Sequence, residues 1–149
     1  MKLKNQILKF YRWIFYGSGA LLFFATLSRL IRIYRPRLHP SLSAGIVFEH
    51  LACGMFATLF LASATLCWKH MILSTPIKAF LTAMRSALFL SVFNLVWEIL
   101  QFKGLAWYAA EPGRFQWEQA MVDQLGILVA IMIVTIPIMV FSRYRRLKV

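Results

Sequence analysis

Four apolar stretches, each long enough to cross a lipid bilayer as a helix, restrict the fold of this chain more than any other feature. A bilayer-spanning helix needs about 20 predominantly apolar residues. A window of that length finds candidate spans at about residues 13–30, 44–68, 79–102 and 117–141. The linkers are short and no residues are left for a second unit. The sequence therefore predicts an all-α, four-helix integral membrane bundle that occupies residues 1–149 as a single domain.

The overall composition favours lipid as the surroundings of these stretches. The chain is 60% hydrophobic and 15% charged, and a soluble globule of this size keeps too much surface exposed to hide so much apolar area. A formal net charge of +12 would suggest nucleic acid as the partner of a soluble protein, but Lys and Arg stand here at the ends of the apolar stretches. Because that placement is typical of membrane topology signals, no nucleic-acid partner is expected.

The distribution of Lys and Arg also predicts the orientation of the bundle. With four spans both termini share one side, which carries ten of the 17 cationic residues, against six on the opposite side. Arg85 lies within the third span and is not counted. The positive-inside rule therefore places the N and C termini in the cytoplasm. All five acidic residues then fall in the outer half of the spans or in the outer loops.

Polar side chains recur at helical spacing near the outer ends of three spans. Asn94, Glu98 and Gln101 stand at i, i+4 and i+7, so they share one face of the third span. Antiparallel packing would gather this face with the outer parts of the second and fourth spans into one polar cavity, about one to two turns below the outer surface. The predicted cavity residues are His50, Asn94, Glu98, Gln101, Gln119 and Asp123.

These residues have structural interpretations beside the functional one. A carboxylate at this depth is costly, so Glu98 either binds a ligand or proton or is a strut paired with His50 or Arg114. Asp123 has the same two interpretations. His50 with a carboxylate partner is a plausible general base, but no nucleophile motif accompanies it, so the residues leave open whether the protein is an enzyme. Ligand type alone would allow a metal on His50, Glu98 and Asp123; no metal or other cofactor is predicted.

A cationic strip follows the first span in the run SRLIRIYRPRLHP. Arg29, Arg32 and Arg35 recur every three residues, and Arg114 lies in the last outer loop. Guanidinium groups pair bidentately with phosphate, so these four residues predict contact with an anionic headgroup or with the phosphate of a lipid-linked carrier. The alternative is plain interfacial anchoring to bulk anionic lipid.

Three short motifs carry a family resemblance over roughly residues 44–140. They are FEHLACGMFATLFL with His50, NLVWEILQF with Glu98 and Gln101, and GRFQWEQAMVDQLG with Arg114, Asp123 and Gly126. In these motifs the chain resembles the VanZ-like family of small bacterial membrane proteins. It departs from the family's pattern at Gln119, where Asp is usual, at Asp123, where Asn is usual, and before His50, where Glu49 is found nearby in place of a common Lys.

The resemblance implies a multi-pass protein of the bacterial cytoplasmic (inner) membrane with an envelope role and a polar intramembrane site, but no settled reaction. We therefore expect an outward-facing intramembrane cavity that binds a membrane lipid or lipid-linked ligand. The alternative is a non-catalytic accessory or assembly subunit of a larger membrane protein complex, because the small residues of the second span suit helix docking. A proton or ion pathway is less favoured, since the inner half supplies no acid to complete a relay.

The orientation can be tested by labelling cysteines with a membrane-impermeant thiol reagent in intact cells. Cysteines introduced at Ser41 or Ala110 should react from outside, because both positions lie in predicted outer loops. A cysteine at Ser142 should react only after the cells are permeabilised. The opposite pattern would contradict the orientation and would move the polar cavity to the cytoplasmic leaflet.

Overall fold

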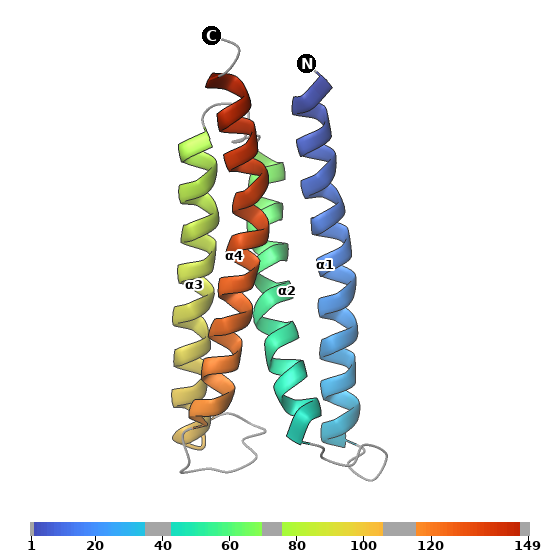
Figure 1. The fold of residues 1–149 in the computed structure, drawn as a ribbon. Coiled ribbons are helices and arrows are strands. Elements are labelled where there is room, and N and C mark those ends of the chain that lie inside the picture. Colours follow the sequence, from blue (N-terminus) through green and yellow to red (C-terminus); the bar gives the residue numbers. More distant parts are fainter. Residues whose placement is uncertain (1, 35–42, 70–75, 106–115, 147–149) are drawn as a thin grey trace.

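The computed structural model describes residues 2–34, 43–69, 76–105 and 116–146, which form an antiparallel bundle of helices (Figure 1). The helices are α1 (Lys2–Tyr34), α2 (Ser43–Lys69), α3 (Pro76–Phe102) and α4 (Trp117–Arg146). Both ends of the chain lie at the same end of the bundle. The all-α bundle predicted from the sequence is confirmed in these ranges; α2, α3 and α4 match their predicted spans to within a few residues, whereas α1 begins well before its predicted start at residue 13.

Three of the helices are long and apolar enough to cross a membrane. The qualifying segments are Phe48–Trp68 in α2, Ile77–Phe102 in α3 and Trp117–Val140 in α4. Helix α1 is the longest, with 33 residues, but it is not among those that meet the requirement within the described residues. The chain thus has the features of a multi-pass membrane protein, while the span at residues 13–30 stays a prediction.

Large apolar side chains on the outside of the bundle support lipid as its surroundings. Phe24 on α1, Phe89 on α3 and Met139 on α4 are each more than half exposed, as are many of their neighbours. Soluble monomers rarely expose contiguous apolar surface of more than a few hundred Å². An exterior of this kind is typical of a surface that is covered by lipid or by another protein.

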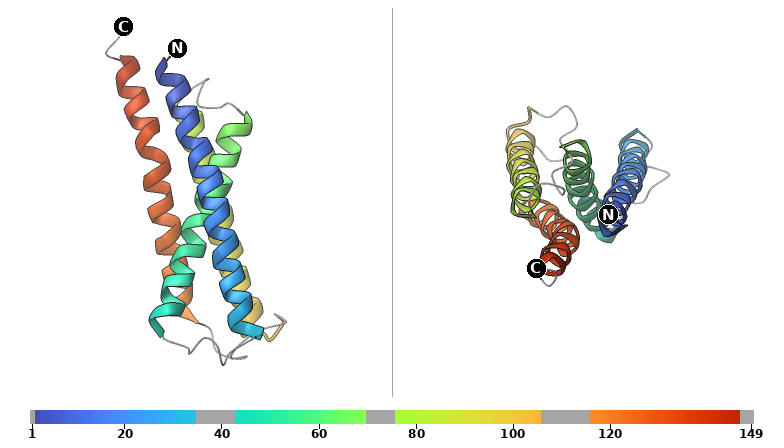
Figure 2. Two further views of the ribbon diagram at one scale, coloured as in Figure 1. Left: turned by 90° about the vertical axis from the view of Figure 1, so that its right-hand side faces the viewer. Right: turned by 90° about the horizontal axis from the view of Figure 1, so that it is seen from above.

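Helix α2 occupies the centre of the arrangement. It packs against α1, α3 and α4, while α1 makes few contacts with any helix other than α2. Seen from above, α1 lies on one side of α2, with α3 and α4 on the other (Figure 2). Polar residues carried by α2, α3 and α4 can therefore meet.

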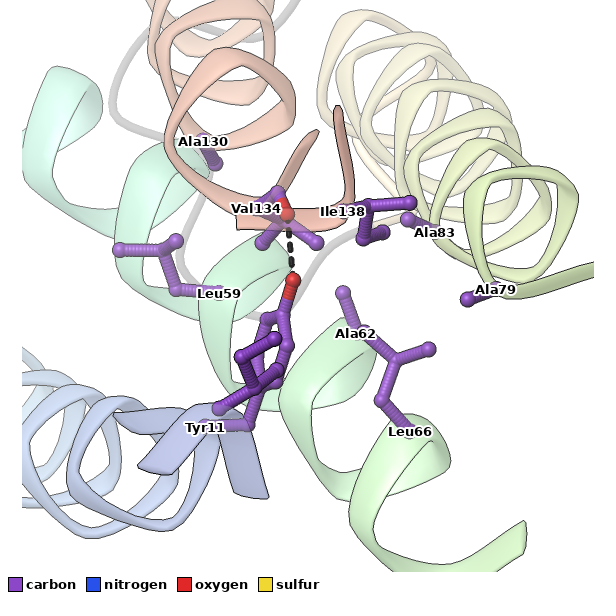
Figure 3. Close-up of a cluster of buried hydrophobic side chains, with 10 residues drawn as sticks. Tyr11, Leu59, Ala62, Leu66, Ala79, Ala83, Ala130, Val134 and Ile138 are labelled. Carbon is purple, nitrogen blue, oxygen red and sulfur yellow. Dashed lines mark hydrogen bonds between the residues drawn. The ribbon is translucent and has the colours of Figure 1, made fainter. Parts of the chain in front are cut away.

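The end of the bundle that holds the two termini has a tightly packed core. Its buried apolar residues come from all four helices (Figure 3): Ile7, Tyr11, Leu59, Ala62, Leu66, Ala79, Ala83, Ala130, Val134 and Ile138. Tyr11 is fully buried, and its hydroxyl donates a 2.6 Å hydrogen bond to the backbone carbonyl of Val134. This bond ties α1 to α4 across 123 residues of sequence.

The Tyr11 bond lies one turn before Pro137, which stands inside α4. Proline has no N–H to donate to the carbonyl four residues earlier, which is that of Ile133, and its ring crowds that turn of the helix. The Tyr11 hydroxyl donates to the next carbonyl along the helix, that of Val134.

Helix α3 has defined signals at both ends. Pro76 stands at its first position, where a missing N–H costs nothing. Gly104, with φ of 67°, follows its last turn. The Gly104 N–H donates to Gln101 O at 3.0 Å and the Leu105 N–H to Leu100 O at 2.9 Å, the bonds of a Schellman motif.

Replacing Tyr11 by Phe should destabilise the bundle by about 1 kcal/mol, because a buried hydrogen bond is lost while the ring still fills its site. The measurement is the unfolding midpoint in detergent, read by circular dichroism. Tyr16→Phe is the matched control, since Tyr16 is 68% exposed on the same helix. Equal midpoints for the two variants would contradict a stabilising role for the Tyr11 bond.

Candidate functional site

Helices α2 and α4 approach each other most closely at two glycines, Gly54 and Gly126. A methyl group added to Gly54 would collide with the backbone carbonyl of Asp123. One added to Gly126 would collide with the carbonyl of Leu51 and lie 2.8 Å from the Met55 backbone nitrogen. The colliding atoms belong to the backbone, so no side chain could move aside to make room for an added methyl group. The two glycines therefore permit backbone-to-backbone packing of the kind that small residues allow in membranes.

The glycine contact brings His50 of α2 against Asp123 of α4. His50 lies one turn before Gly54 and Asp123 nearly one turn before Gly126, so both side chains leave their helices beside the crossing. Nδ1 of His50 is 3.0 Å from Oδ2 of Asp123, and both residues are buried. With the carboxylate ionised and the imidazole neutral, the Nδ1–H of the ring donates to the carboxylate, which can only accept. Nε2 then carries the lone pair of the ring.

A cavity of about 290 Å³ adjoins this pair, between α2 and α3 with part of α4. Its volume is near the lower end of the range for ligand sites, roughly 300–1,000 Å³. Its polar lining residues include His50, Asn94 and Asp123, and the remainder is mostly apolar and aromatic. The lining comprises His50, Cys53, Gly54 and Ala57 of α2, Leu90, Phe93, Asn94 and Trp97 of α3, and Asp123 and Ile127 of α4.

Asn94 supplies the third polar group of the cavity. Its Nδ2 atom is buried and has no hydrogen-bond partner among the described residues. A buried amide nitrogen without an acceptor lowers the stability of the fold by about 1–3 kcal/mol. An apolar side chain that only filled this position would not carry that penalty. The amide thus presents an unused donor on the α3 side of the cavity, opposite the α2 residues.

The hydroxyl side chains near the site differ from Asn94 in this respect. Thr58 donates to Gly54 O at 2.7 Å, one turn earlier on its own helix, and Ser63 donates to Leu59 O at 2.5 Å. Such i−4 bonds satisfy a hydroxyl within one helix. Gln124 reaches across to α3, where its Nε2 donates to Ser91 O at 3.4 Å. These polar groups are satisfied by the protein itself.

The structure places the other residues of the predicted cavity nearby but not in its lining. Glu98 is 1% exposed and Gln101 is buried, and both continue the face of α3 that begins with Asn94. Gln119 is half-buried, one turn before Asp123 on α4. Of the six predicted residues, His50, Asn94 and Asp123 line the cavity, and Glu98, Gln101 and Gln119 are not among its lining residues.

The four arginines predicted to contact headgroups cannot be placed in the same detail. Arg35 and Arg114 lie outside the described residues, as do the side chains of Arg29 and Arg32, whose backbone belongs to α1. Among the described residues, no group of three or more His, Cys, Asp or Glu side chains could hold a metal ion. The two cysteines are free.

Sequence reasoning missed the aromatic wall of the cavity, formed by Phe93 and Trp97. Both were hidden among the many aromatic residues that a membrane protein turns toward lipid. The available signal was helical spacing. Leu90 stands four residues before Asn94 and Trp97 three residues after it, so both share a face of α3 with this polar residue. Phe93, next to Asn94, is 57% exposed and marks the edge where the cavity meets the outside of the bundle.

Comparison with models of known protein families, with curated proteins and with solved structures finds no match to this chain. The resemblance to the VanZ-like family consequently stays a prediction carried by the three short motifs. What the site can do has to be argued from its own geometry.

Replacing Gly126 by Ala should destabilise the bundle by more than 1 kcal/mol, because the added methyl collides with the α2 backbone and forces the helices apart. Gly54→Ala should have a similar effect. Gly17→Ala is the control, since a methyl there meets nothing within 4 Å, and it should be neutral or slightly stabilising. The measurement is the unfolding midpoint in detergent. A neutral Gly126→Ala would contradict the close backbone contact.

Proposed function

We propose that this protein binds a membrane lipid or a lipid-linked ligand in the cavity between α2, α3 and α4. The observation that carries the proposal is a cavity with two properties: polar groups from three helices and an apolar remainder that reaches the outside of an apolar bundle. The His50–Asp123 pair and the Asn94 amide supply the polar groups. Leu90, Phe93 and Trp97 supply apolar surface on α3.

The chemistry of these walls matches an amphiphile better than a water-soluble ligand. Ligand sites are typically lined by apolar and aromatic side chains with a few polar groups that fix orientation. Here Phe93 is both part of the lining and largely exposed on the apolar outside of the bundle. A chain entering from the bilayer would therefore leave lipid for similar surroundings, while its polar end would reach His50 and Asn94.

The location of the protein belongs to the same proposal. We place it in the bacterial inner membrane, with both termini in the cytoplasm and the cavity in the outer leaflet, on the cation distribution and on the resemblance to the VanZ-like family. The shared end of the two termini in the bundle agrees with that topology. The predicted headgroup arginines, Arg29, Arg32, Arg35 and Arg114, would lie toward the outer surface.

The direct test is mass spectrometry of the lipids that remain bound after purification in a mild detergent. We expect one lipid class to be enriched over its share of the membrane extract. Ala57→Phe should reduce that enrichment at least fivefold, because Ala57 lines the cavity and a phenyl ring there would project into the space that the ligand needs. Leu90→Trp fills the cavity from the opposite wall and should act in the same way.

The control is Ala20→Phe, which makes the same substitution at an exposed position of α1. All variants are compared as monodisperse protein from size-exclusion chromatography. Equal lipid retention by the wild type and both cavity-filling variants would contradict the proposal. Copurification of a stoichiometric partner protein in place of a lipid would support the accessory-subunit alternative.

A further inference from the structure

The polar groups of the cavity define which chemical group of a ligand they can hold. Asn94 Nδ2 is a hydrogen-bond donor without a partner in the described protein. Nδ1 of His50 lies 3.0 Å from Oδ2 of Asp123; with the ring neutral and the carboxylate ionised, Nδ1–H donates and Nε2 is an acceptor. The cavity thus offers the amide N–H of Asn94 as a donor on α3 and, in this tautomer, the imidazole Nε2 of His50 as an acceptor on α2.

We propose that the cavity recognises the free hydroxyl group of a single-chain amphiphile, such as a long-chain alcohol or a monoacylglycerol. An alcohol oxygen can accept from Asn94 and at the same time donate its proton to His50 Nε2. A methyl ether could only accept, and a ketone or ester carbonyl likewise leaves the imidazole without a donor. This inference rests on the proposed lipid-binding function and specifies its ligand.

The charges of the site favour a neutral group over phosphate. Phosphate sites in proteins typically use Arg or Lys, and the cavity lining contains neither. With the carboxylate ionised and the imidazole neutral, the His50–Asp123 pair carries a net negative charge. An anion placed beside it would lose its hydration without gaining a counter-charge.

The size of the cavity favours one hydrocarbon chain. A volume of about 290 Å³ cannot enclose a two-chain phospholipid. It can hold a small polar end and the first part of one chain, with Leu90 and Phe93 beside the chain on its way to the bilayer. Because Phe93 is largely exposed, the rest of the chain would lie along the outer face of α3.

Binding can be measured through Trp97, which lines the cavity. Dibrominated octadecanol quenches tryptophan fluorescence on contact, and the part of the quenching that is lost in Trp97→Phe reports occupancy of the cavity. Oleyl alcohol, oleyl methyl ether and oleyl phosphate are then compared as competitors of equal chain length on the unmodified protein in detergent. Monooleoylglycerol is included to distinguish a glycerol hydroxyl from a simple alcohol.

We expect oleyl alcohol or monooleoylglycerol to compete at about tenfold lower mole fraction than the ether or the phosphate, the difference that one hydrogen bond accounts for. Asn94→Leu should weaken alcohol binding by a similar factor. Asn5→Leu, the same substitution at an exposed position of α1, should leave it unchanged.

Each remaining outcome is decisive. If the ether competes as well as the alcohol, or the phosphate competes better, hydroxyl recognition is wrong while lipid binding stands. If dibrominated octadecanol produces no quenching that depends on Trp97, the proposed lipid-binding function fails as well. The comparison of ligands needs no variant at Asn94, so a folding defect in Asn94→Leu would not prevent a decision.

Discussion

The backbone contact between α2 and α4 at Gly54 and Gly126 is the constraint on which the rest of the site depends. Lipid provides no hydrophobic force between helices, so their association relies on close packing and on polar contacts. Gly54 faces the backbone of α4 and Gly126 faces the backbone of α2, which allows that packing at one point. His50 and Asp123, within a turn of the glycines, are brought to 3.0 Å as a consequence. The polar pair is thus positioned by the part of the interface that has no side chains.

The two ends of the bundle differ because the inward face of α3 changes character along its length. Near the termini this face carries Ala79, Ala83 and Ala87, all buried, and the neighbouring helices close around a dense core. Further along, the face continues with Leu90 and Trp97, whose bulk prevents an equally close approach. A cavity forms where small residues give way to large ones, and the polar residues of α2 and α4 line it.

Helical periodicity was enough to predict much of this arrangement. The apolar runs gave the helices to within a few residues at most ends, although α1 extends well before the predicted span at residue 13. The spacing of Asn94 and Glu98 gave the inward face of α3, and both are largely withdrawn from the surface. Periodicity does not give the level along the bundle at which two helices meet, nor the rotation of each helix about its own axis. It therefore could not decide whether Asp123 or Glu98 would be the partner of His50, because both carboxylates lie at similar heights on inward faces.

The distribution of hydrogen bonds explains why Asn94 carries information about a ligand that the hydroxyl residues do not. Thr58, Ser63 and Thr82 each donate to a carbonyl one turn earlier on their own helix, so they are satisfied whatever occupies the bundle. The amide nitrogen of Asn94 has no acceptor on its own helix. Because it is buried, this unused donor opposes folding. Its counterpart on α2, Nε2 of His50, is an acceptor when the neutral ring keeps its proton on Nδ1 and donates that hydrogen bond to Asp123. A donor and an acceptor held on different helices are satisfied together by a group that is both acceptor and donor, and an alcohol is the simplest such group that an apolar chain can carry into the bilayer.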